Sequence, residues 1–196
     1  MGAATLFRFD PQFYRGVPQE LLVPERLCEL GPGKPNKAAR KALDSLDARA
    51  LADGRTVKDA DMAACCISGL WLLHDYLDQS HKINQNIETT TGSYWHGIMH
   101  RREPDYSNAK YWFRRVGRHE VFPVLAAEVK EQAQDSAEAR IAESWVGSGS
   151  WDAAAFVDSC ENARGCGTAG ELYCRRVARL EWKILFDYCY REAFAG

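Results

Sequence analysis

Helical periodicity along most of the chain is the feature that most narrows its possible folds. The longest example runs from about Thr168 to Ala193, where apolar residues recur every three or four positions on one face and charged residues occupy the other. No segment of strand length alternates apolar and polar residues. The pattern therefore predicts an all-α fold.

Capping and helix-breaking residues divide most of the chain into segments of helical length. The expected helices cover residues 37–52, 59–82, 91–103, 108–116, 123–134, 137–145, 152–164 and 168–193. Asp59 or Asp61 is the expected N-cap of the second helix, and Pro104 ends the third. We expect a single-domain, irregular bundle of about six to eight helices.

The N-terminal part differs from the rest because it is rich in proline. Residues 1–36 contain Pro11, Pro18, Pro24, Pro32 and Pro35. Proline lacks a backbone N–H donor and interrupts helices, so this stretch is expected to be extended, with one short helix near Gln19 to Glu29. We predict an N-terminal arm over residues 1–36 that packs on a helical body of residues 37–196.

Composition and charge exclude several classes of protein. With 196 residues, of which 46% are hydrophobic, the chain can form one sizeable core. A net charge of −2 provides no general attraction for nucleic acid or an anionic membrane. The chain has no apolar run of transmembrane length and no secretory signal pattern, and its seven cysteines form no CxxC pair. We expect a cytoplasmic protein with reduced thiols. The sequence allows a homo-oligomer but does not determine the oligomeric state.

Four of the five histidines lie within 27 residues, and two of these are in the expected helix 59–82. On one continuous helix, His74 lies at the centre of the apolar stripe, and Asp78 and His81 continue that face. A buried histidine or carboxylate costs free energy unless it is paired. We therefore predict His74 and Asp78 as catalytic groups, and place His81 and His119 at the margin of the site.

The next expected helix has the spacing of a metal site. His96, His100 and Glu103 follow at i, i+4 and i+7, which places their side chains on one face over two turns. Histidine and carboxylate groups in this arrangement are typical ligands of a divalent transition metal. We predict His74, His96, His100 and Glu103 as the metal ligands, with one such ion as the cofactor.

A carboxylate also occupies the apolar stripe of the last helix. Glu181 lies among apolar residues at helical spacing, so burial would leave its charge in need of a partner. The candidates are a histidine of the two preceding sets, an arginine of the 101–118 segment, or a metal ion. We predict Glu181 as a third catalytic group.

Positive charge and aromatic residues are concentrated in residues 96–119. Six basic residues face two acidic ones there, a local charge of +4. Arginine forks beside aromatic walls are typical of pockets for phosphate- or carboxylate-bearing small molecules. The predicted ligand-binding residues are Trp95, Arg101, Arg102, Tyr111, Arg114 and Arg115.

These patterns lead to two hypotheses about function. The first is a small-molecule enzyme, a hydrolase or lyase, that performs metal-assisted hydrolysis or acid/base chemistry on an anionic substrate. The second is a non-catalytic ligand-binding or protein-interaction domain, in which the buried histidine and glutamate residues form a structural network. The presence or absence of a stoichiometric metal ion distinguishes them.

Overall fold

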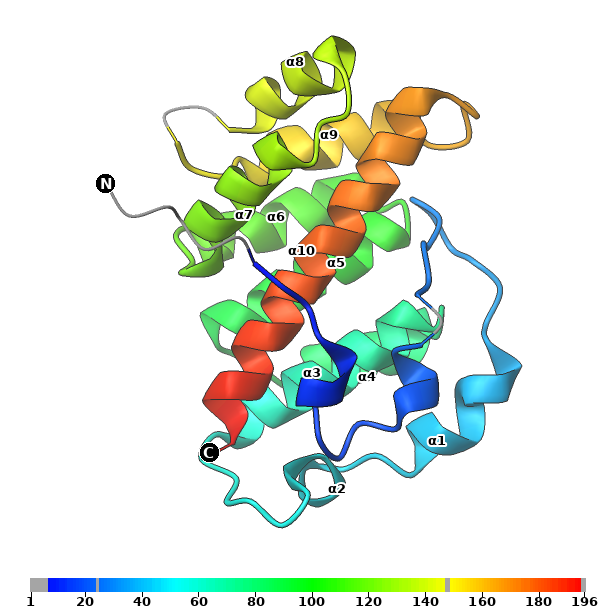
Figure 1. Ribbon diagram of the computed structural model, residues 1–196, viewed down its shortest axis with the longest axis vertical. Coiled ribbons are helices and arrows are strands. Elements are labelled where there is room, and N and C mark those ends of the chain that lie inside the picture. The colour runs from blue at the N-terminus through cyan, green and yellow to red at the C-terminus, as the bar shows by residue number, and fades with distance from the viewer. Residues whose placement is uncertain (1–6, 24, 147–148, 195–196) are drawn as a thin grey trace.

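The structure, a computed structural model, describes residues 7–23, 25–146 and 149–194. Within these ranges it has ten α-helices and no β-strand, so the predicted all-α class is confirmed. The helices are α1 (Arg40–Asp44), α2 (Ala48–Ala52), α3 (Ala60–Leu73), α4 (Leu77–Asn84), α5 (Thr90–Arg102), α6 (Tyr106–Val116), α7 (Val121–Glu131), α8 (Ser136–Trp145), α9 (Ala153–Ala163) and α10 (Ala169–Ala193). The long α10 runs through most of the molecule (Figure 1).

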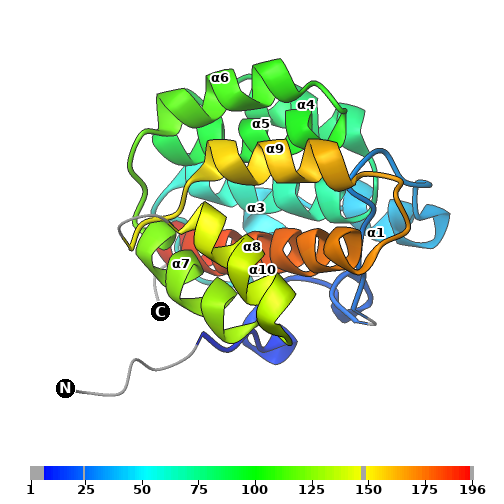
Figure 2. The same ribbon diagram turned by 90° about the horizontal axis from the view of Figure 1, so that it is seen from above.

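The helices surround α10 and a second central helix, α5. Helix α10 contacts α3, α7 and α9, whereas α5 packs against α3, α4 and α6. Seen from above, α6 and α4 lie on the side of α5 that is remote from α10 (Figure 2). The site described below is built on that side of α5.

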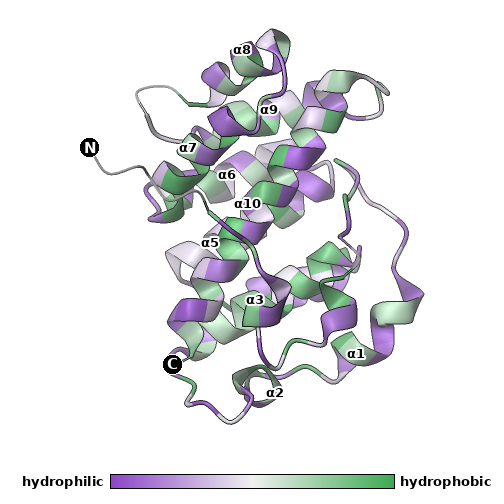
Figure 3. Ribbon diagram, viewed as in Figure 1, coloured by the Kyte–Doolittle hydropathy of each residue, from purple (hydrophilic) through white to green (hydrophobic). Residues whose placement is uncertain are grey.

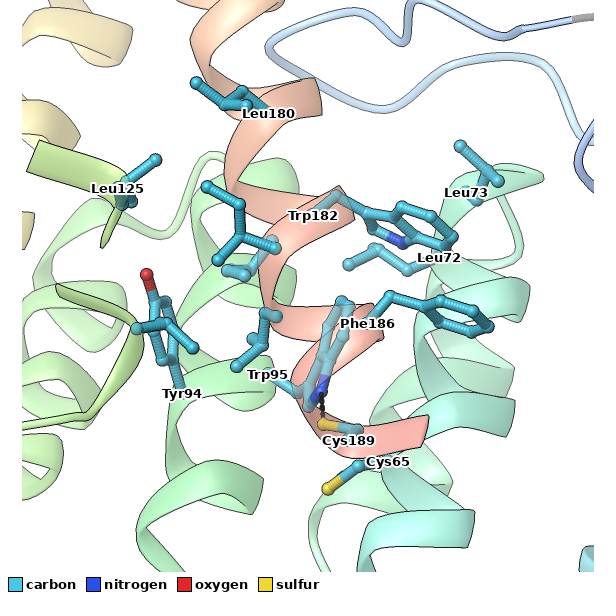
Figure 4. Packing of buried hydrophobic residues seen from close by; sticks show 14 of the residues in the cluster. Cys65, Leu72, Leu73, Tyr94, Trp95, Leu125, Leu180, Trp182, Phe186 and Cys189 are labelled. Atoms are coloured by element: carbon cyan, nitrogen blue, oxygen red, sulfur yellow. Dashed lines mark hydrogen bonds between the residues drawn. The ribbon is translucent and has the colours of Figure 1, made fainter. Parts of the chain in front are cut away.

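The close packing of α3, α5 and α10 depends on a glycine. A Cβ atom added at Gly69 of α3 would lie 2.7 Å from Cη2 of Trp95 on α5, so a larger residue does not fit there. The backbone carbonyl of Gly69 also accepts a hydrogen bond of 2.8 Å from Nε1 of Trp182. Figure 4 shows Trp95 and Trp182 within this core, with the indole N–H of Trp95 directed at Cys189.

The described part of the N-terminal arm lies against α10 and α3. The Tyr14 hydroxyl donates a 2.9 Å hydrogen bond to Asp187, and the Tyr14 ring packs against Phe186. The expected helix near Gln19 to Glu29 is reduced to a 3₁₀ turn over Gln19–Leu21; residues 1–6 and Pro24 lie outside the described residues. Helix α10, against which the arm lies, carries both hydrophobic and hydrophilic residues along its length (Figure 3).

Ten helices replace the expected six to eight because two expected helices are each divided in two. The segment 37–52 breaks at Ser45, whose hydroxyl donates to the carbonyl of Ala42, and Asp47 then caps α2. The segment 59–82 breaks after α3. Asn36 of the arm donates its N–H to the carbonyl of His74, and Asp75 adopts a left-handed conformation with φ of 63°.

Candidate metal centre

Three histidines from two neighbouring helices converge on the side of α5 that faces α4. His96 and His100 lie one turn apart on α5, and their rings stack with centroids 4.8 Å apart. His81 of α4 approaches both rings edge-on, with centroid distances of 4.9 and 5.1 Å. One ring nitrogen of each histidine lies within 4.8 Å of the others. Among the described residues, this is the one group of histidine, cysteine and carboxylate side chains close enough to share a metal ion.

A metal ion would draw the three rings slightly closer together. Zinc binds imidazole nitrogen at about 2.0–2.1 Å, which places tetrahedral nitrogens roughly 3.4 Å apart. The ring nitrogens of this group are up to 4.8 Å apart, so coordination needs a closure of about an ångström. His81 is half-buried, whereas His96 and His100 are buried. Rotation of the His81 side chain is therefore the simplest way to close the set.

His96 has an environment that an ordinary core histidine avoids. Its side chain is 3% exposed, and neither ring nitrogen has a hydrogen-bond partner among the described residues. Its ring instead stacks on Trp112 of α6, at a centroid distance of 4.0 Å. A buried polar atom without a partner costs about 1–3 kcal/mol. A ligand that accepts a nitrogen lone pair would remove that cost.

Burial also keeps the imidazoles in the form that binds metal. Together with the smaller effects of the neighbouring His100 and His81, burial lowers the pKa of His96 to about 3. Burial and His81 likewise lower the pKa of His100, against a smaller opposing effect of Asp105. Both rings are therefore neutral at neutral pH, which leaves a lone pair for a metal ion.

Glu103 lies beside the metal-ligand set rather than within it. Its carboxylate is 3.3 Å from Nδ1 of His100, and Nδ2 of Asn108 is 3.1 Å from Nε2 of the same ring. A carboxylate on the second nitrogen orients a ligating histidine and raises its basicity. Burial raises the pKa of the Glu103 carboxyl against the opposing effect of His81, and the charges of Asp78 and Asp105 add to the rise. Glu103 can therefore hold or release a proton next to the histidines.

An acidic groove opens next to the three histidines. Its volume is about 680 Å³, and its walls include the carboxylates of Asp78, Glu103 and Asp105 together with that of Asp75. Arg40 is the one basic side chain that lines it among the described residues. Asp78, predicted from sequence as catalytic, thus lies close to the histidines. Excess negative charge favours cations in this groove over anions.

His74 is separated from the histidine cluster, which corrects its predicted place among the metal ligands. Its Nε2 lies 3.0 Å from the carbonyl oxygen of Leu21, and its Nδ1 lies 3.0 Å from Nδ2 of Asn36. Both ring nitrogens are therefore occupied by the N-terminal arm. The prediction assumes one helix over 59–82, but α3 ends at Leu73 with His74 as its C-cap, and a separate helix, α4, begins at Leu77.

Glu181 is fully buried and pairs with an arginine, which is one of the three kinds of partner predicted from the sequence. Arg101 forms a buried salt bridge with it, and the Tyr94 hydroxyl donates a 3.1 Å hydrogen bond to its other oxygen. Burial by itself lowers the pKa of the Arg101 guanidinium. The charge of Glu181 outweighs burial, so the pKa is raised. Glu181 lies outside the histidine cluster, in a structural network.

The arginines and aromatic residues expected to form one anion pocket are divided among several places. Arg101 is paired with Glu181, and Arg102 pairs with Asp75 and donates to the carbonyl of Gly31. The remaining predicted residues show two environments: Trp95 is in the core, and Tyr111, Arg114 and Arg115 are exposed on α6. The structure therefore does not bring the six residues together around one cavity.

His119, which the sequence left at the margin, is a buried histidine with ordinary partners. Its Nε2 lies 3.1 Å from the Thr91 hydroxyl, and its Nδ1 accepts a hydrogen bond from the N–H of Val121. Burial lowers its pKa to about 4. In the unfolded chain the His119 imidazole has its ordinary pKa of about 6.5. As the pH falls, the unfolded state therefore takes up a proton at this side chain before the folded state does.

We therefore expect His119 to make folding less stable as the pH falls from about 6.5 towards 4. Urea unfolding at several pH values, with chelator present, measures this effect in the unchanged protein and in His119→Phe. The variant is expected to lose less unfolding free energy over that range. Equal losses in both proteins contradict the assignment of this pH dependence to His119.

Two members of the cluster, His81 and Trp112, were missed from the sequence. The sequence places His81 on the same face as His74 and Asp78 but at the margin of the site, whereas the structure places it against His96 and His100. Trp112 comes from α6, and only the packing of α5 against α6 brings its ring onto His96. The signal in the sequence is the concentration of histidines itself, four of which lie within 27 residues.

Comparison with protein-family models, curated proteins and solved structures gave no significant match. Among the described residues, no helix has both the length and the apolar character needed to cross a membrane.

Proposed function

We propose that this protein binds one divalent transition metal ion at His81, His96 and His100 and uses it to activate water for hydrolysis. The observation that carries the proposal is His96, whose two ring nitrogens are buried without a partner among the described residues, beside two further imidazoles. Neutral imidazole suits zinc, copper, iron and nickel, and zinc is the ion that serves hydrolysis most simply.

The geometry around the three histidines supports a catalytic use. Three protein ligands leave a fourth position open on a tetrahedral ion, as in zinc enzymes, where the ion lowers the pKa of bound water to about 7. Glu103 lies next to the ligand His100 and carries a carboxyl with a raised pKa. It is the side chain that we propose as the acid/base group, with Asp78 lining the same groove.

The charge of the groove bears on the substrate class. Asp78, Glu103 and Asp105 line it beside Arg40, whereas the fourth carboxylate, Asp75, is already paired with Arg26 and Arg102. The remaining negative charge favours a neutral or positively charged molecule there over the anionic substrate expected from sequence. We therefore propose a substrate with a neutral hydrolysable bond near a cationic or uncharged group. The arginines that indicated an anionic ligand lie elsewhere, either in buried ion pairs or exposed on α6.

A structural role for the histidines is the second candidate. The stack of His96 between Trp112 and His100, with centroid distances of 4.0 and 4.8 Å, favours it, because flat rings in such a stack contribute packing energy by themselves. His74 and Glu181 already serve structural networks of this kind. The two candidates differ in one measurable respect, which is metal binding.

Metal analysis of the purified protein tests the proposal. After chelation, reloading with Zn²⁺ and dialysis, we expect about one zinc per chain, measured by plasma mass spectrometry. His96→Ala should retain almost none, whereas His74→Ala, a buried histidine outside the cluster, should keep the full complement. A folded unchanged protein that retains no zinc, copper, iron or nickel overturns the proposal and supports the structural stack.

A further inference from the structure

A buried ion pair ties the break between α3 and α4 to the end of α5. Asp75 lies in this break, two residues before α4 begins, and its Oδ1 is 2.5 Å from Nη2 of Arg102. Arg102 is the last residue of α5 and follows the proposed ligand His100 by two positions. The two side chains are only 4% and 8% exposed. The pair therefore connects the start of α4 with the end of α5, the two helices that supply the three histidines.

Among the described residues, no hydrogen bond or ion pair joins α4 directly to α5. The Ser80 hydroxyl of α4 instead lies 2.8 Å from that of Ser68 on α3. His81 meets the two histidines of α5 through ring contacts. In the described part of the chain, the pair of Asp75 and Arg102 is therefore the polar link between the two helices.

The N-terminal arm holds Asp75 in its place. Arg26 of the arm donates a 2.8 Å hydrogen bond to the second carboxylate oxygen. The carbonyl of Gly31 accepts a 3.1 Å hydrogen bond from Nε of Arg102. Gly33 packs so closely that an added Cβ atom would lie 2.5 Å from Oδ1 of Asp75. Because both oxygens are paired and the arm lies against them, the carboxylate has a fixed position, as a group that orients others requires.

We propose that Asp75 is a positioning residue of the metal centre, whose ion pair with Arg102 holds His81 at binding distance from the two histidines of α5. The inference rests on the metal binding proposed above. Coordination needs a closure of about an ångström in this set, so the affinity depends on how firmly α4 is held against α5. Replacing residues that orient metal ligands typically changes the affinity about 10- to 100-fold.

Zinc affinity, measured by competition with a chromophoric chelator, tests this role in Asp75→Asn and Arg102→Gln. The two substitutions remove charges of opposite sign, so a purely electrostatic effect would weaken zinc binding in the first and strengthen it in the second. A loss of positioning weakens binding in both. Asparagine tolerates the φ of 63° at position 75, so the backbone of the break is kept.

Asp187→Asn is the matched control. Asp187 is also a carboxylate that pairs with an arginine and accepts a hydrogen bond from the arm, but it lies on α10. The double variant Asp75→Asn with Arg102→Gln removes both buried charges of the pair together. It therefore tests the inference even if a single variant fails to fold, and circular dichroism shows which variants are folded.

We expect each single variant to bind zinc at least about tenfold more weakly than the unchanged protein, and Asp187→Asn to bind within about twofold of it. The double variant should bind no more weakly than the weaker single variant, because the same ion pair is lost in all three. The visible spectrum of bound Co²⁺ is the second measurement, and a loss of stability alone does not change it. In Asp75→Asn it should shift towards the spectrum of His81→Ala, which lacks one imidazole ligand.

Three results overturn the positioning role and leave the metal centre in place. They are zinc affinities of the folded variants within about twofold of the unchanged protein, affinities that change in opposite directions, and a cobalt spectrum equal to that of the unchanged protein. A folded, unchanged protein that binds no zinc overturns the metal centre and this inference with it.

Discussion

Glu181→Gln is expected to lower the free energy of unfolding by about 3–5 kcal/mol, although it replaces only one oxygen by an amide nitrogen. The substitution removes the carboxylate charge that Arg101 faces in an environment where both side chains are almost fully buried. It also places an amide where the Tyr94 hydroxyl donates its hydrogen bond. The buried guanidinium left without a carboxylate is the larger cost, because the neutral amide does not offset its charge.

A double variant separates the broken pair from a simple loss of packing. Glu181→Leu combined with Arg101→Met removes both charges and keeps similar volume, so we expect stability within about 1–2 kcal/mol of the unchanged protein, or above it. Urea unfolding followed by circular dichroism provides the free energies for the single and double variants. A Glu181→Gln protein within about 0.5 kcal/mol of the unchanged one contradicts the pairing that the structure shows.

Zinc is expected to raise the free energy of unfolding by about 4 kcal/mol when its free concentration is a thousand times its dissociation constant. The ion binds only the folded chain, since the three imidazoles come together through the packing of α4 on α5. In His96→Phe this stabilisation should disappear. The phenyl ring keeps the stack on Trp112 but offers no ligand atom.

The same substitution has a different result without metal. In the presence of chelator, His96→Phe removes two buried nitrogens that lack partners, so its unfolding free energy should equal or exceed that of the unchanged protein. His74→Phe is the control: it strands Asn36 and the Leu21 carbonyl, and should cost about 1–3 kcal/mol. A large loss in metal-free His96→Phe indicates that its nitrogens are hydrogen-bonded in solution, contrary to the structure.

The fold class could be predicted from sequence because helix ends are signalled locally. Asp59 caps α3 and Thr168 caps α10, each through a side-chain oxygen that accepts a backbone N–H two or three positions into the helix. The break after α3 could not be predicted in this way. It depends on Asn36, far away in sequence, and on the pairing of Asp75 with Arg26 and Arg102.

In the candidate site, too, contacts within one helix could be predicted from the sequence, whereas contacts between residues far apart in the sequence could not. His96 and His100 could be paired from their spacing, because one turn of helix places them on one face. That His81 and not His74 completes the cluster depends on where the helix breaks, which the spacing does not show. The partner of Glu181 could be limited to three classes from its burial, but only the structure shows that Arg101 is the one.

X-ray absorption at the zinc edge of the reloaded protein tests the metal centre most directly. We expect a first shell with about three imidazole nitrogens at roughly 2.0–2.1 Å and one further light ligand, with the imidazole contribution lost in His96→Phe. A six-oxygen shell, sulfur ligands, or the same spectrum in His96→Phe contradicts binding at His81, His96 and His100.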